Sequence, residues 1–135
     1  QMGAMTDEDL PGLIEDDYLP LYLHRQEPGH RDLILDMARE LGIDCFRAQT
    51  NALAGRPDAS QTLQSIEHPT LIIGSTEDPL CPPAVQLEMH RLAAHSELLM
   101  LKDCGHFSTL ERPEAVSRAL RAWYTENGQG QEPQR

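Results

Sequence analysis

Two residues of this chain combine a reactive side chain with a position suited to catalysis. Asp78 comes shortly after the apolar run at residues 70–74, and His106 comes shortly after the run at residues 97–101. Each run predicts a buried strand of a parallel sheet. A carboxylate and an imidazole at the ends of neighbouring strands are two members of a Ser-His-Asp triad, in which the acid orients the base and the base takes the serine proton.

The nucleophile of such a triad has no counterpart here, because G-x-S-x-G occurs nowhere in the 135 residues. Ser75 and Ser108 are near the predicted site, but neither stands in a strand-serine-helix elbow. Ser108 and Glu111 instead predict a capping box at a helix start. Cys81 and Cys104 lie near the same strand ends and could in principle replace serine. Free cysteine is nevertheless often only a small buried hydrophobe.

Two weaker interpretations of the residues near these strand ends are a different carboxylate as the triad acid and a metal site. Glu77 adjoins Asp78 and is expected to point away, while Asp103 is more typical of a turn or a capping residue. A zinc site would need ligands from Asp78, Cys81, Cys104 and His106. Their spacings match no common zinc pattern, so we expect neither a metal nor an organic cofactor.

The first half of the chain has a helical pattern. Residues 6–24 predict short helices with a break near Pro20. Residues 31–41 carry apolar side chains at i, i+3, i+4 and i+7 spacing, which predicts a helix that Gly42 ends. Asp44 then has the residue type of an N-cap for a second helix, running to about Leu53.

The second half alternates strands and helices. After the strand at residues 70–74, Pro82 and Pro83 open a helix, and Pro113 opens a last helix after the second strand. This order predicts an α/β fold with a short parallel sheet and a right-handed crossover. Two strands leave an edge open, which proteins avoid. We therefore expect either a missing N-terminal half or self-association, with a dimer as the simplest form.

The motifs at the two strand ends resemble those of the α/β-hydrolase family, in the branch of small esterases, lactonases and C–C hydrolases. The family pattern is P-T-L-x-x-x-G-x-x-D-x-x-x-P, followed by C-G-H-x-S-x-x-E-x-P-E. The chain departs from it at Ser75, where the family usually has glycine. The matching residues are Pro69, Thr70, Leu71, Asp78, Pro82, Cys104, Gly105, His106, Ser108, Glu111, Pro113 and Glu114.

This resemblance implies a partial α/β-hydrolase fold consisting of cap helices and the last two core strands. It implies that Asp78 is the triad acid, that His106 is the base, and that the complete protein hydrolyses a small ester, lactone or acyl substrate. The family's nucleophile and oxyanion-hole segments are absent from this sequence, so we expect the chain alone to be inactive. The alternative is a non-catalytic remnant that self-associates or binds a small molecule.

The sequence suggests four regions. Residues 1–5 resemble a cloning remnant, residues 6–66 form the cap-like helical region, residues 67–125 form the core segment, and residues 126–135 lack apolar side chains and predict a disordered tail.

Composition restricts the partners. The formal net charge of −11 argues against nucleic acids and anionic membrane surfaces, both of which attract basic patches. No apolar run approaches the roughly 20 residues of a membrane span, and no signal peptide is recognisable. Three widely spaced cysteines suit reduced thiols. We therefore expect a cytoplasmic protein that acts on a small molecule.

Overall fold

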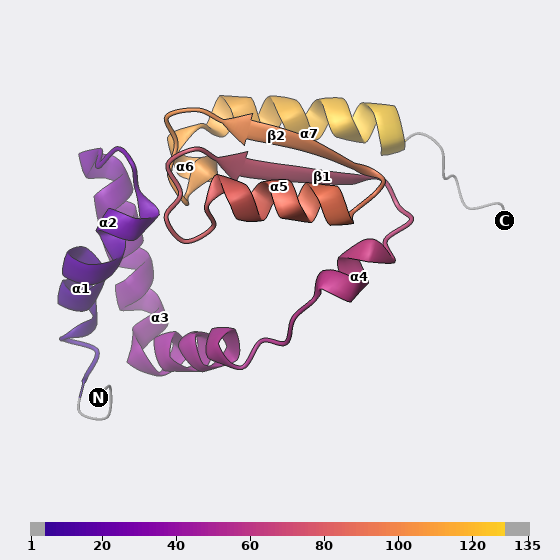
Figure 1. Ribbon diagram of the computed structural model, residues 1–135. Coiled ribbons are helices and arrows are strands. Elements are labelled where there is room, and N and C mark those ends of the chain that lie inside the picture. Colours follow the sequence, from indigo (N-terminus) through magenta and orange to yellow (C-terminus); the bar gives the residue numbers. More distant parts are fainter. Residues whose placement is uncertain (1–4, 129–135) are drawn as a thin grey trace, which may run out of the picture.

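The computed structural model describes residues 5–128, and its N-terminal half is helical (Figure 1). Three short segments follow one another: α1 (Leu10–Leu13), the π-helical turn η1 (Ile14–Tyr18) and α2 (Leu19–Tyr22). Short helices were predicted here, but the break expected near Pro20 is absent. Pro20 lies in the first turn of α2, where its missing N–H has no helical partner to lose.

The long helix α3 (Pro28–Ala54) bends at Gly42, whose φ of 74° lies outside the helical region. This bend agrees with the predicted division into two helices, because glycine adopts positive φ without steric cost. The predicted N-cap is wrong, however. The N–H of Ile43 donates to Oδ1 of Asp7 at 2.7 Å. The carboxylate of Asp44 instead accepts a hydrogen bond from the side chain of Arg47. The capping carboxylate thus comes from a distant part of the sequence.

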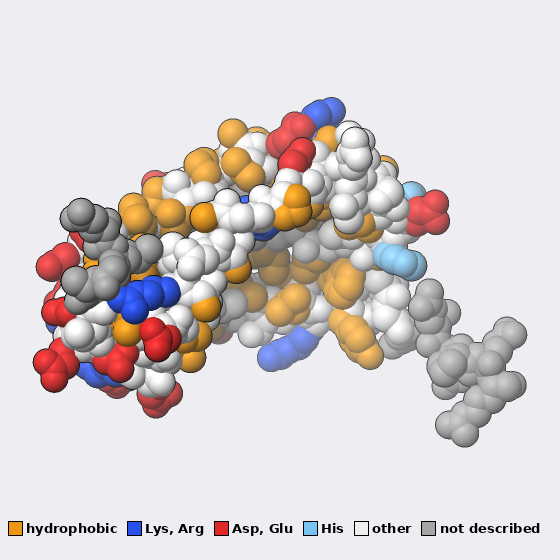
Figure 2. Space-filling view, turned by 90° about the horizontal axis from the view of Figure 1, so that it is seen from below, with side chains coloured by type: hydrophobic (Ala, Val, Ile, Leu, Met, Phe, Trp, Pro, Cys, Tyr) orange, Lys and Arg blue, Asp and Glu red, His pale blue; other side chains and the backbone are white. Residues whose placement is uncertain are grey.

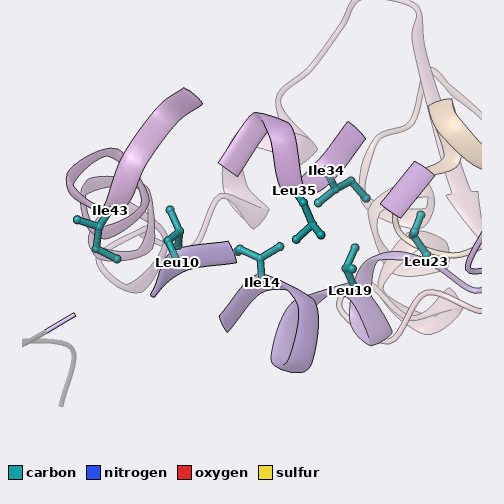
Figure 3. Packing of buried hydrophobic residues seen from close by; sticks show 7 residues of the cluster. All are labelled: Leu10, Ile14, Leu19, Leu23, Ile34, Leu35 and Ile43. Carbon is teal, nitrogen blue, oxygen red and sulfur yellow. The ribbon is translucent and has the colours of Figure 1, made fainter. Parts of the chain in front are cut away.

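The helical half has its own apolar core (Figure 3). Side chains from α1, η1, α2 and the residue after α2 meet the inner face of α3, and each of them is at most 6% exposed. The bend in α3 lets both of its halves contribute to this cluster. Its members are Leu10, Ile14, Leu19, Leu23, Ile34, Leu35 and Ile43.

The second half contains a parallel sheet of two strands, β1 (Thr70–Ser75) and β2 (Ser96–Leu101), as predicted. The strands are in register from the Thr70–Ser96 pair to the Ser75–Leu101 pair, so their carboxyl ends coincide. The sheet lies between α5 (Pro83–Leu92) and α7 (Pro113–Asn127) (Figure 1). Helix α5 approaches β1 closely because Gly74 has no side chain, and a Cβ there would lie 2.7 Å from Cγ of Gln86.

Two short helices complete the structure. Helix α4 (Ser60–Gln64) was not predicted and links the helical half to β1, whereas α6 (Ser108–Glu111) follows the second strand. Helix α7 continues through Asn127, so the first two residues of the predicted tail are helical. The rest of that tail, and residues 1–4 of the predicted cloning remnant, lie outside the described residues.

Within residues 5–128, the sheet has only these two strands, so each strand has one edge without a backbone partner. No helix in the same part of the chain is both long enough and apolar enough to cross a membrane.

Candidate active site

The loop after β1 holds the Asp78 carboxylate in a fixed orientation. The N–H groups of Leu80 and Cys81 both donate to its Oδ1 at 2.9 Å. The loop itself is tied to the end of β2, because the N–H of Glu77 donates to the carbonyl oxygen of Cys104 at 3.0 Å. The Asp78 side chain is 6% exposed. These two N–H groups bind Oδ1, so the second oxygen, Oδ2, remains available to accept another hydrogen bond.

That oxygen faces His106. Oδ2 of Asp78 lies 2.9 Å from Nδ1 of His106, within the range of about 2.6–3.2 Å predicted for a working pair. When the ring proton is on Nδ1, the imidazole donates to the carboxylate and leaves Nε2 as a proton acceptor. The His106 side chain is 31% exposed, so part of it is accessible from solvent.

The rival carboxylates do not contact His106. Glu77 is exposed, as expected. Asp103 has a φ of 55°, which fits the predicted turn. Its carboxylate forms ion pairs with Arg25 and Arg112 and contacts Nε2 of His24 at 3.0 Å. Of these three carboxylates, Asp78 is the one in hydrogen-bonding contact with His106.

The His106 loop is attached to the segment that follows α2. The N–H of Phe107 donates to the carbonyl oxygen of Tyr22 at 3.0 Å. Glu111 connects the same two segments, since its Oε1 accepts the N–H of Gly105 and its Oε2 accepts the N–H of Arg25. The predicted capping box is therefore wrong, because Glu111 binds these two backbone groups.

Tyr22 is a site residue that the sequence did not reveal. Its ring stacks on Phe107 with centroids 4.7 Å apart and on His106 at 6.0 Å. Burial, with a smaller contribution from Tyr18, raises the pKa of Tyr22 above its ordinary value. No local pattern marks this tyrosine. Glu111, in contrast, belongs to the family motif, although its partners could not be read from it.

Gly105 should be intolerant of any side chain. A Cβ there would lie 2.6 Å from the backbone nitrogen of His24 and 2.7 Å from Oε1 of Glu111. We expect Gly105→Ala to reduce the free energy of unfolding by about 1–3 kcal/mol, the usual cost of overpacking. Thermal or urea unfolding measures this. Gly29→Ala is the control, because a Cβ at Gly29 meets nothing within 4 Å, and an equal loss in both variants would contradict the prediction.

The remaining candidate nucleophiles differ in their surroundings. Cys104 is fully buried, and this burial raises the pKa of its thiol and disfavours the reactive thiolate. Ser75 is 3% exposed, and Ser108 begins the four-residue helix α6. Cys81 is partly exposed, and its sulfur lies close to Asp78 and His106. None of these residues stands at the strand-to-helix turn of a nucleophile elbow.

An apolar cavity of about 170 Å³ opens in the helical half beside this site. Two of the residues that line it, Tyr22 and Phe107, stack on each other, and both are within ring contact of His106. The rest of its lining comes largely from η1 and α3, including Ile14, Met37 and Phe46. The cavity can accept an apolar group near the imidazole.

The protein family described as TAP-like protein matches residues 37–134. This match covers most of the chain, and solved α/β-hydrolase structures share its fold. The chain therefore belongs to this α/β-hydrolase family, and the predicted fold class, a partial α/β-hydrolase fold, is confirmed.

Over the aligned residues, individual relatives are identical to this chain at about a third of the positions or fewer. The proline iminopeptidase of Lactobacillus crispatus is 36% identical over 64 residues, which are 47% of this chain and 22% of that protein. A thermophilic esterase from Thermogutta terrifontis superposes with a TM-score of 0.80 at 27% identity, over 89% of this chain and 46% of the esterase. An esterase from Exiguobacterium antarcticum, at 20% identity and a TM-score of 0.68, supports the fold alone.

The chain is much shorter than these proteins. It spans 27% or less of the curated relatives and about half of the esterase structures that it matches.

Proposed function

We propose that Asp78 and His106 are the acid and base of a serine-hydrolase triad, and that a protein containing this chain together with a nucleophile segment hydrolyses a small ester or related acyl substrate. The observation that carries this proposal is the 2.9 Å contact between Oδ2 of Asp78 and Nδ1 of His106. Membership of the α/β-hydrolase family supports it.

In this proposal, the serine and the oxyanion hole come from a segment outside the 135 residues. Nε2 of His106 takes the serine proton as the hydroxyl attacks the acyl carbon, and the resulting imidazolium then protonates the leaving group. Asp78 keeps the ring in the required tautomer and stabilises the imidazolium. The two backbone donors on Oδ1 keep the carboxylate aimed at Nδ1 throughout the cycle.

The substrate class follows from the cavity and from one relative. A volume of about 170 Å³ with an apolar lining suits a short acyl or alkyl group better than a long polar chain. A solved structure with 27% identity to this chain is described as an esterase, which favours an ester among the acyl substrates.

A hybrid enzyme tests the proposal. The part of the Thermogutta terrifontis esterase that this chain does not cover would be fused to residues 5–128 and assayed with short-chain nitrophenyl esters. We expect saturable turnover that requires His106. A folded hybrid that lacks turnover, or one whose activity is unchanged by His106→Ala, would refute the assigned roles. His68→Ala, which alters an exposed histidine, is the matched control.

A second function, self-association without catalysis, is favoured by the exposed apolar surface. Each strand of the sheet has an unpaired edge within the described residues. Hydrophobic side chains also gather around a hollow on the face shown in Figure 2. Large hydrophobic side chains that are exposed on α3 and α5 are those of Leu33, Met37, Leu41, Leu53, Val85 and Leu87.

We expect the isolated chain to form a dimer at micromolar concentration. An unpaired backbone group that becomes buried costs about 1–3 kcal/mol, and a second copy can pair the open strand edge while covering apolar surface. Sedimentation velocity measures the association. Fusion to the esterase half should cover the same edge and give a monomer. A monomeric isolated chain at all concentrations would contradict this prediction.

A further inference from the structure

We propose that Asp78, Cys81 and His106 form a binding site for Zn²⁺. One carboxylate oxygen, the sulfur of Cys81 and one ring nitrogen of His106 all lie within 4.8 Å of one another. The triad proposed above uses Asp78 and His106 but gives Cys81 no role.

Two loops bring these ligands together. In the loop after β1, Oδ1 of Asp78 accepts the N–H of Cys81 at 2.9 Å, so the chain turns back and places the thiol beside the carboxylate. His106 arrives from the loop after β2, held by its own contact with Oδ2 of Asp78. Because the third ligand comes from a separate loop, no zinc-binding spacing is visible in the sequence.

The set of donor atoms suits zinc. Cysteine sulfur, histidine nitrogen and carboxylate oxygen are all common zinc ligands, and three protein ligands with an open fourth position are typical of zinc sites that also bind water. Tetrahedral bonds of about 2.0–2.3 Å place ligand atoms about 3.2–3.7 Å apart. The observed separations of at most 4.8 Å therefore require side-chain movements of about 1 Å.

The surroundings favour a cation and allow it to enter. Asp78 is buried, so its charge is poorly solvated, whereas Cys81 and His106 are partly exposed and leave a route from solvent. The formal net charge of −11 raises the local concentration of cations. Cys104 is fully buried and is not a member of this cluster of three ligands.

Metal binding and acid–base catalysis would exclude each other here. A zinc ion bound to the carboxylate and the imidazole replaces the proton that they share, and the imidazole can then no longer take a proton from a nucleophile. Zinc should therefore inhibit any hydrolase built on this pair. The metal site itself depends only on the geometry of the three side chains, so it does not rest on the proposed hydrolysis.

The test uses the full 135-residue chain with its thiols reduced. Calorimetric titration with Zn²⁺ should show one site, and Co²⁺ should give the intense near-ultraviolet absorption band of a thiolate-to-metal charge transfer. Cys81→Ser should remove this band and weaken zinc binding at least about tenfold. Cys45→Ser is the matched control, because Cys45 is also a partly exposed free cysteine but lies outside the cluster, and this variant should behave like the unaltered chain.

The pH dependence of the zinc affinity provides a second measurement. Zinc requires a neutral imidazole and a thiolate, so protons compete with the metal and its affinity should fall as the pH is lowered. His106→Ala should also weaken binding at least about tenfold, and circular dichroism would verify that both variants fold. Absence of zinc binding, or a charge-transfer band that persists in Cys81→Ser, would overturn the proposal. Either result leaves the hydrolytic proposal intact, because that proposal is decided by turnover of the hybrid.

Discussion

His106→Ala should lower kcat of the hybrid enzyme by about 10⁶, and Asp78→Asn should lower it by about 10⁴, as found for triads of other serine hydrolases. The histidine loss is larger because the imidazole itself takes the serine proton in the proposed mechanism, whereas Asp78 only orients it. The amide of asparagine favours the wrong ring tautomer while it leaves most of the geometry in place. Steady-state kinetics with nitrophenyl esters would measure both effects.

KM and a control variant test the same assignment as the loss of kcat. KM should change little in either variant, because neither side chain lines the apolar cavity. Glu77→Gln is the matched control for Asp78→Asn, since Glu77 is the adjacent carboxylate but is exposed. A loss of less than tenfold in Asp78→Asn, or an equal loss in Glu77→Gln, would show that Asp78 is not the triad acid.

The isolated 135-residue chain should show no saturable esterase turnover. In the proposed triad it supplies only the acid and the base, because its sequence has no G-x-S-x-G elbow, and the loss of a single oxyanion donor already costs about 10²–10³ in rate. Hydrolysis of nitrophenyl butyrate would be followed at several chain concentrations, with free imidazole as the reference for simple base catalysis.

Saturable turnover by the chain alone would contradict this prediction and would direct attention to Cys81, whose sulfur is near His106. Two variants would then separate the cases. Turnover that disappears in Cys81→Ser and in His106→Ala would identify a cysteine nucleophile. Turnover that persists in Cys81→Ser but is lost in Ser108→Ala would identify the serine at the start of α6.

The sequence predicted the meeting of Asp78 and His106 because both follow strands that run parallel. Once two apolar runs form a parallel pair in register, the residues that follow them must emerge at the same edge of the sheet. The bend at Gly42 was predictable for a similar local reason, since glycine tolerates the positive φ that interrupts the helix.

Other features depended on contacts between distant parts of the chain. The α-helical spacing around Asp44 could not show that Asp7 accepts the N–H of Ile43. The motif that contains Glu111 resembled a capping box, but its carboxylate binds the N–H groups of Gly105 and Arg25, the latter in the segment after α2. Local pattern rules consider neighbours within about four residues and therefore miss such partners.

The amino-acid sequence by itself determined the α/β class, the strand ends and the pair of residues, Asp78 and His106, that meet there, because these follow from local hydrophobic periodicity and from motifs within single loops. Only the tertiary structure decided that Tyr22 stacks on His106, that Glu111 joins two segments and that Cys81 lies beside the pair. The physical reason is that these contacts join segments far apart in the sequence, such as the end of α2 and the loop after β2, and no periodic pattern within either half encodes how they pack.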